Sequence, residues 1–314
     1  SERAFLLAHD TDPFNRWEAG RALAKSVLAR MITDGAAPGE AWLSGVERVL
    51  FDESLDPAFR ALALRLPGED DMARTLHDAG FTPDPDRIHA ERRRLGLGLA
   101  QRLGPRLGQL RDAMAVDGPY RPDAASAGRR GLRLALLGLI SRLDGGAEAA
   151  RAYALADNMT DQIGALACLL ETGRGDAETA DFAAQWAADR LVMDKWFAVQ
   201  IMAAAPAQAV DVARRLVARE DFEWKNPNRF RAVIGTLSAA HAGFHRADGS
   251  GYGLVADWLL RLDPFNPQTA ARMSTAFDSW GRYDAERQAL MRAALGRIGA
   301  APGLSRDLGE MVGR

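Results

Sequence analysis

The chain has 314 residues, of which 47% are hydrophobic, 26% are charged and 7% are aromatic. This composition is typical of a globular protein with a sizeable core, and it excludes a disordered chain, a collagen-like chain and a disulfide scaffold. The 40 Lys and Arg residues are balanced by 42 Asp and Glu residues. Because this balance leaves no net positive field, neither nucleic acid nor an anionic membrane is expected as a partner.

The sequence also bears on where the protein works. No apolar run approaches the ~18–20 residues that cross a bilayer, and the N-terminal residues lack the pattern of a signal peptide. The one cysteine, Cys168, is expected to be a small core residue in a reducing compartment. We therefore expect a cytoplasmic protein. The first residue is Ser1 rather than Met, which favours a piece of a longer protein.

Along the chain, apolar residues recur every three to four positions, and this period predicts helices. The pattern is clear over 13–33, 126–143, 178–193 and 207–219. Ala, Leu, Arg and Glu dominate while Val, Ile and Thr are sparse, so the intrinsic propensities agree with the period. No convincing series of alternating strands is present. The sequence predicts an all-α protein.

Four dipeptides place a capping side chain directly before a proline, which predicts the first turn of a helix. They are Asp12-Pro13, Asp56-Pro57, Asn226-Pro227 and Asn266-Pro267. Within each half of the chain the two starts are about 40 residues apart, the length of two helices with their turns. We therefore predict a superhelical solenoid of stacked antiparallel helix pairs, of the HEAT or armadillo type. A single domain over 1–314 is the first expectation, and a boundary at about residue 120 is the alternative.

Few residues suggest catalysis or metal binding. His241 and His245 are four residues apart, which places two imidazoles on one face of a helix. The zinc peptidase motif requires Glu directly after the first His, where this chain has Ala242. We therefore predict surface or capping roles for the two histidines, with no metal, cofactor or catalytic residue in this chain. The basic run 92–94 is expected to be a solvated helix face rather than a nucleic-acid patch.

Two predicted helix starts carry polar groups that could bind a ligand. Arg229 and Arg231 follow the first start, while Gln268 and Arg272 lie one turn apart after the second. If the two helices are neighbours, their exposed N–H groups and these guanidinium groups would attract carbonyl or carboxylate groups. The alternative is that the arginines pair with acidic groups of the adjacent repeat and stabilise the stack.

Seven segments, in chain order, resemble the C-terminal part of bacterial aminopeptidase N, a family of zinc-dependent gluzincin aminopeptidases. The segments are HDTDPFNRWE (9–18), ADNMTD (156–161), MDKWF (193–197), NPNR (226–229), DGSGY (248–252), NPQ (266–268) and RYDA (282–285). The resemblance extends from residue 5 to the C-terminus, with a poorly matched middle. It implies the terminal helical domain, which in this family forms a cone-like superhelix that closes over the catalytic domain.

The resemblance implies that zinc binding and catalysis belong to another part of the parent enzyme. Family members bind zinc through His-Glu-x-x-His and a downstream Glu, and they carry a Gly-Ala-Met-Glu-Asn motif; neither motif occurs here. Zinc would therefore belong to the parent enzyme's catalytic domain, which would be this chain's partner together with peptide substrates. The resemblance also implies that Gln268 and Arg272 approach the substrate side-chain pocket and that Arg231 lies on the inner wall.

Two functions follow as expectations. In the first, the chain encloses the active site of a metallopeptidase that removes N-terminal residues from peptides, and the chain alone has no peptidase activity. In the second, it is a free-standing helical-repeat adaptor whose concave surface binds a protein or peptide.

Overall fold

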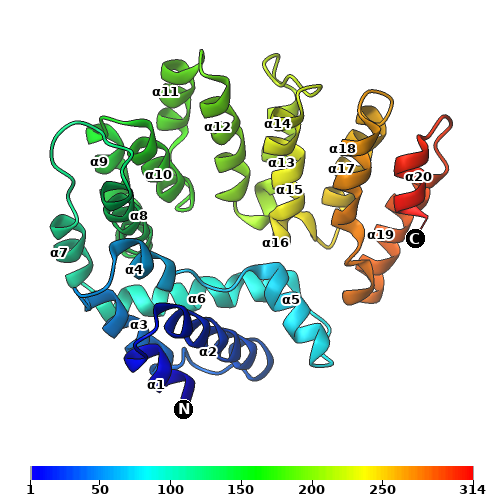
Figure 1. Ribbon diagram of the computed structural model, residues 1–314. Coiled ribbons are helices and arrows are strands. Elements are labelled where there is room, and N and C mark those ends of the chain that lie inside the picture. The colour runs from blue at the N-terminus through cyan, green and yellow to red at the C-terminus, as the bar shows by residue number, and fades with distance from the viewer. Residues whose placement is uncertain (1, 314) are drawn as a thin grey trace. The chain divides into compact units, whose positions relative to one another are not determined.

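The computed structural model describes residues 2–313, and every regular element in that range is a helix (Figure 1). No strand occurs between these two residues. The all-α prediction is therefore confirmed.

The chain forms two compact units. Unit 1 comprises the described residues up to Thr75 together with Arg87–Glu178. Unit 2 comprises Leu76–Asp86 and the described residues from Thr179 onward. Residue 120, the alternative boundary suggested by the sequence, lies inside unit 1, and the single domain over 1–314 stays a prediction.

Unit 1 contains a group of helices packed around α8. Its helices, of which α5 and α6 cross the unit boundary, are α1 (Glu2–His9), α2 (Pro13–Asp34), α3 (Glu40–Phe51), α4 (Pro57–Ala63), α5 (Glu69–Asp78), α6 (Pro85–Leu103), α7 (Arg106–Ala113), α8 (Ala124–Asp144), α9 (Ala147–Leu155) and α10 (Met159–Leu170). Helix α8 contacts α4, α7, α9 and α10, while α1 packs on α2 and α3. The Leu7 side chain of α1 packs closely against Gly20 of α2 and Gly45 of α3. A Cβ at either glycine would lie within 2.9 Å of the Leu7 side chain.

Unit 2 stacks its helices largely in chain order. They are α11 (Asp176–Trp186, which begins in unit 1), α12 (Arg190–Met202), α13 (Pro206–Val217), α14 (Pro227–Phe230), the π-helix η1 (Arg231–Gly235), α15 (Thr236–Ala239), α16 (His241–Phe244), α17 (Ser250–Leu262), α18 (Pro267–Ser274), the 3₁₀ turns η2 (Thr275–Phe277) and η3 (Trp280–Arg282), α19 (Ala285–Gly299) and α20 (Arg306–Val312). Contacts join α12 to α13, α13 to α17, α17 to α18 and α19, and α20 to both α18 and α19. Figure 1 shows these helices side by side, from green at α11 and α12 through yellow and orange to red at α20.

The four predicted helix starts are correct. Helices α2, α4, α14 and α18 begin at the prolines that the sequence indicated. In each case the side chain of the residue before the proline accepts a backbone hydrogen bond. Asp12 Oδ1 accepts from the Phe14 amide at 2.8 Å, and Asn266 Oδ1 accepts from the Thr269 amide at 3.0 Å. These caps satisfy amide groups that the helix itself leaves without a partner.

One predicted helix is wrong in extent. The apolar period over 178–193 is broken, because α11 ends at Trp186 and α12 begins at Arg190. Asp189 causes the break: its carboxylate accepts hydrogen bonds from the amides of Leu191 and Val192, at 3.0 and 3.1 Å. An aspartate used as a cap starts a new helix instead of continuing the old one.

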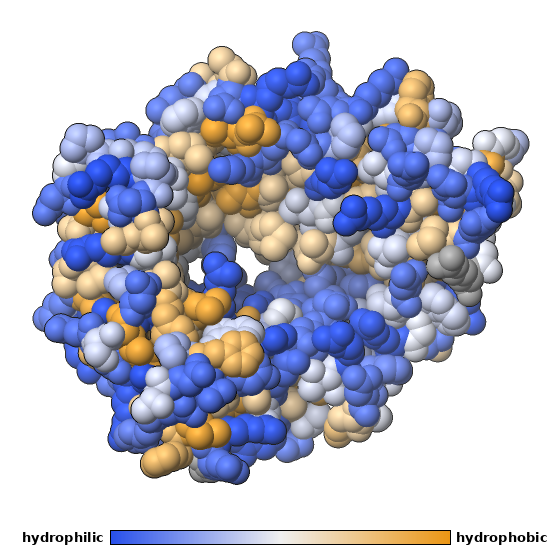
Figure 2. Space-filling model, viewed as in Figure 1, coloured by the Kyte–Doolittle hydropathy of each residue, from blue (hydrophilic) through white to orange (hydrophobic). Residues whose placement is uncertain are grey.

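Hydrophilic side chains cover most of the face shown in Figure 2, with hydrophobic residues in small groups between them. Between residues 2 and 313, no helix is both long enough and apolar enough to cross a membrane.

Candidate functional site

The two helices that carry the predicted ligand-binding residues are neighbours within unit 2. Just before their first turns, the rings of Trp224 and Phe265 meet edge to face with centroids 5.1 Å apart, and the Lys225 ammonium lies 4.1 Å from the Phe265 centroid. Further along, a Cβ at Gly235 would lie 3.3 Å from the terminal methyl of Met273. The segment α14–η1 and helix α18 therefore lie next to each other, as the sequence argument required.

Three of the four candidate residues are exposed on this pair of helices. Arg231 begins the π-helix, and Gln268 and Arg272 lie on α18. We call Arg231, Gln268 and Arg272 the α14–α18 surface. The Arg231 Nη1 donates to Asn228 Oδ1 at 3.2 Å, and within the described residues neither Arg231 nor Arg272 forms an ion pair. Single-turn π-helices are rare and are frequent at functional sites.

The chemistry of the α14–α18 surface is that of binding. Guanidinium groups donate several hydrogen bonds to carbonyl or carboxylate oxygens, and the Gln268 amide can donate and accept. None of the three side chains can serve as a nucleophile or as a general base near neutral pH. The surface can therefore donate hydrogen bonds to carbonyl or carboxylate oxygens, but none of these three side chains would react with such a group.

Arg229 belongs to the core rather than to this surface. Only 4% of the residue is exposed, and its Nε donates to Asp194 Oδ1 at 2.5 Å. Its Nη1 donates to the Asp221 carbonyl at 2.5 Å, and the guanidinium lies 4.5 Å from the Phe197 centroid. Arg229 thus pairs with an acidic group of a neighbouring helix, as in the alternative that the sequence left open. The prediction that Arg229 lies beside a substrate is wrong.

The predicted surface or capping role of the histidine pair is wrong. His241 and His245 are 6% and 3% exposed, with ring centroids 4.8 Å apart. His241 Nε2 lies 2.9 Å from the Tyr283 hydroxyl, and His245 Nδ1 lies 2.8 Å from the Tyr252 hydroxyl. The sequence could not reveal this role, because both tyrosine partners come from other helices or turns of the fold.

This arrangement does not fit a zinc site. One nitrogen of each imidazole is engaged by a tyrosine hydroxyl, and zinc requires carboxylate, thiolate or imidazole ligands in a tetrahedral set. Over residues 2–313, no group of three or more His, Cys, Asp or Glu side chains is arranged to hold a metal ion.

Burial of His245 makes stability depend on pH. Desolvation lowers its pKa well below 6.5, and the nearby His241, Arg287 and Arg282 lower it further. Because the unfolded chain then binds more protons than the folded one, the stabilisation is complete above pH ~6.5 and is lost as the pH falls below that value, by about 1.4 kcal/mol per unit at most.

We therefore expect the wild-type protein to lose about 1 kcal/mol more unfolding free energy than His245→Asn when the pH falls from about 7.5 to about 5.5. The amide of the variant keeps an acceptor for the Tyr252 hydroxyl but does not titrate. Urea unfolding at both pH values measures the difference. If the unfolding free energy fell equally in the two proteins, His245 would not be held neutral in the folded state.

Cys168 is a core residue, as predicted. It is buried and free, and desolvation raises its pKa to about 12. A thiol with so high a pKa is a poor nucleophile.

A chain whose described elements are all helices, stacked largely in chain order in unit 2, has the architecture of a helical-repeat protein. The family model described as "Domain of unknown function (DUF3458_C) ARM repeats" matches residues 1–314. The chain belongs to this family, the C-terminal ARM-repeat domain of aminopeptidase N.

Similar proteins support this assignment. The chain is 39% identical to aminopeptidase N of Caulobacter vibrioides, over 100% of this chain and 37% of that protein. It is 32% identical to aminopeptidase N of Escherichia coli, over 98% of this chain and 36% of that protein. A crystal structure of Legionella pneumophila aminopeptidase A in complex with aspartic acid matches with a TM-score of 0.87 at 26% identity, over 99% of this chain and 38% of that one. The chain thus spans little more than a third of the relatives that it matches.

Proposed function

We propose that this chain controls the access of peptides to the active site of a zinc aminopeptidase that removes N-terminal residues. The proposal is carried by the similarity of the whole chain to part of aminopeptidase N in Caulobacter vibrioides. Its partners are then the catalytic domain of the same protein and the peptide substrate. A free, buried Cys168 suits a cytoplasmic enzyme.

In this proposal the α14–α18 surface faces the substrate. Arg231 and Arg272 have no acidic partner among the described residues, so their guanidinium groups are available to peptide carbonyl or carboxylate oxygens. A helical wall around a reaction centre selects substrates by size and reduces the water around them, which strengthens such polar contacts. Zinc and the reacting groups lie outside this chain, and the free-standing adaptor lacks comparable support because all the relatives named above are aminopeptidases.

The 314-residue chain alone is expected to have no aminopeptidase activity, even with added zinc. The physical reason is that a hydrolytic zinc site needs three protein ligands and a general base, and the described residues do not assemble such a set. Turnover of aminoacyl chromogenic substrates by the purified chain measures this. Zinc-dependent turnover that a chelator abolishes would contradict the proposal.

In an aminopeptidase that contains this chain, Arg272→Ala is expected to raise KM or shift peptide preference by about tenfold, because a charge-assisted hydrogen bond is worth roughly 1.5–3 kcal/mol. The melting temperature should not change, since the side chain is exposed. Arg306→Ala is the matched control: this arginine is also exposed, but it lies on α20 and pairs with Glu310. A variant that unfolds, with unchanged kinetics in the folded fraction, would assign Arg272 to stability alone.

A further inference from the structure

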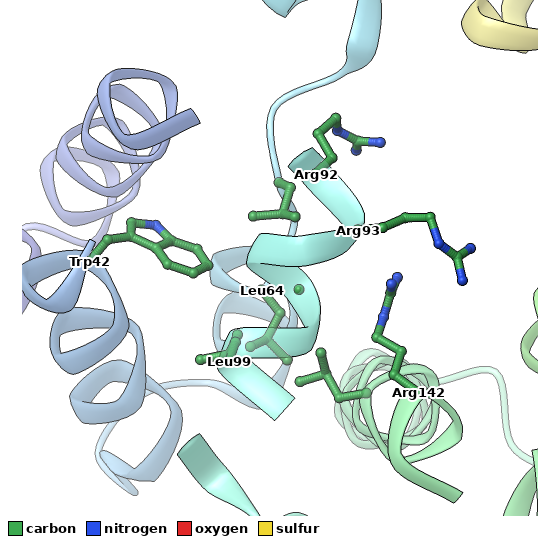
Figure 3. A pocket seen from close by; sticks show the side chains of 9 residues that line it. Trp42, Leu64, Arg92, Arg93, Leu99 and Arg142 are labelled. Atoms are coloured by element: carbon green, nitrogen blue, oxygen red, sulfur yellow. The ribbon is translucent and has the colours of Figure 1, made fainter. Parts of the chain in front are cut away.

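Unit 1 contains a pocket of about 160 Å³ between α3, α6 and α8 (Figure 3). Its apolar part is formed by Trp42, Leu64, Leu99 and Leu139. Its polar part consists of Arg92, Arg93 and Arg142, with no acidic side chain in the lining. A pocket with a hydrophobic floor and three cationic side chains has the composition of a site for an amphipathic anion.

Two of the arginines converge from different helices. Figure 3 shows Arg93 on α6 and Arg142 on α8 with their guanidinium groups directed toward the same space. The two side chains also line a second pocket of about 330 Å³, which extends toward Cys168 and Glu171. They therefore stand at the junction of the two cavities.

The positive charge at this junction is poorly compensated. The Nε of Arg142 is buried and has no hydrogen-bond partner, and its Nη2 lies 3.6 Å from Glu171 Oε2, a carboxylate whose side chain is 46% exposed. Within the described residues, Arg93 forms no hydrogen bond or ion pair. Desolvation lowers the pKa of Arg142; the Glu171 carboxylate opposes this shift, while repulsion from Arg93 and Arg92 adds to it. A desolvated charge without a full partner is costly, so an anion placed here would relieve that cost.

The other arginines of the basic run are neutralised. Arg92 Nε donates to the Pro67 carbonyl at 2.6 Å and its Nη1 lies 3.3 Å from Glu69. Arg94 pairs with Glu91 at 2.6 Å. Arg93 and Arg94 are exposed, as expected of a solvated helix face, while Arg92 is half-buried. Arg93 is the member of the run without a partner among the described residues. No sequence pattern pointed to Arg142, because its side chain reaches the run only where the fold brings α8 near α6.

Gly96 makes room for this arrangement. A Cβ at Gly96 would lie 3.4 Å from Arg142 Cζ, in contact with the guanidinium group. A larger side chain at this position of α6 would occupy the space that the guanidinium now fills. The glycine thus leaves space for the Arg142 guanidinium next to α6.

We propose that this pocket binds a small organic carboxylate, with the carboxylate between Arg93 and Arg142 and the apolar body on Leu64, Leu99 and Leu139. Guanidinium groups hold a carboxylate through paired, charge-assisted hydrogen bonds. An apolar cavity of about 150 Å³ is known to admit benzene, so a body of that size matches the floor. A hydrated inorganic ion would gain nothing from the leucines. The proposal does not depend on the peptide-access function.

The test is a calorimetric titration of the 314-residue chain at low ionic strength with three probes. Benzoate is expected to bind at least tenfold more tightly than benzamide, which has the same shape without the charge, and more tightly than inorganic phosphate. Binding of benzoate should weaken as salt is added, because screening reduces the attraction. Equal binding of benzamide would overturn the charged site, and tighter binding of phosphate would overturn the organic class.

Variants locate the site. Arg142→Gln and Arg93→Gln are each expected to weaken benzoate binding by tenfold or more, and Gly96→Leu should abolish it by filling the space beside Arg142. Arg151→Gln is the matched control, because this exposed arginine of unit 1 pairs locally with Glu148. Without ligand, Arg142→Gln should melt at or above the wild-type temperature, since it removes a poorly paired charge. Unchanged benzoate affinity in both Arg93→Gln and Arg142→Gln would overturn the proposal.

Discussion

Replacing Arg229 by alanine is expected to lower the free energy of unfolding by about 3–5 kcal/mol. The guanidinium is 5% exposed and its partner Asp194 is 15% exposed, so the substitution leaves a largely buried carboxylate without its cation. It also removes the hydrogen bond to the Asp221 carbonyl and the contact with the Phe197 ring. These groups come from α12 and the loop before α14, and their loss loosens several elements of unit 2 together.

Chemical denaturation measures this effect, with Arg231→Ala as the matched control. Arg231 lies two residues further along and is exposed, so its truncation should change the unfolding free energy by less than about 0.5 kcal/mol. A double-mutant cycle with Asp194→Asn isolates the coupling of the pair. If Arg229→Ala and Arg231→Ala have the same small effect, the buried ion pair does not stabilise the stack.

Gly251→Ala is expected to destabilise the protein by about 3 kcal/mol, the upper end for overpacking. A Cβ at Gly251 would lie 2.3 Å from the carbonyl oxygen of Phe244, and this oxygen belongs to the backbone and cannot rotate away. Phe244 is 1% exposed and packs on the Tyr252 and Phe277 rings at centroid distances of 5.1 and 5.6 Å, which resists a backbone shift.

Gly253→Ala, on the same helix, is expected to change stability in the opposite direction. Nothing lies within 4 Å of a Cβ at Gly253, so the substitution should stabilise α17 by about 0.5–1 kcal/mol through the better helix propensity of alanine. Thermal or chemical unfolding of the two variants compares them directly. Two changes of equal sign would mean that the close approach of α17 to Phe244 does not restrict position 251.

The sequence determined the helical class and many of the helix ends, because both depend on local chemistry. Apolar residues at a period of three to four made the chain helical, and the side chains of Asp12 and Asn266 supplied caps that the structure shows in place. The same local chemistry placed Gln268 and Arg272 one turn apart on an exposed face of α18. For these features the deciding contacts reach only three or four residues along the chain.

Which polar residues are buried and paired, and which are exposed, depends on contacts between helices that are distant in sequence. Arg229 and Arg231 are nearly adjacent in sequence, yet Asp194 from α12 neutralises the first and not the second. His241 and His245 became core residues because Tyr252 and Tyr283 fold onto them. Arg142 of α8 and Arg93 of α6 line one pocket because the fold brings their side chains together. Charge compensation and desolvation depend on neighbours that other elements of the fold supply, which the local period of a helix does not specify.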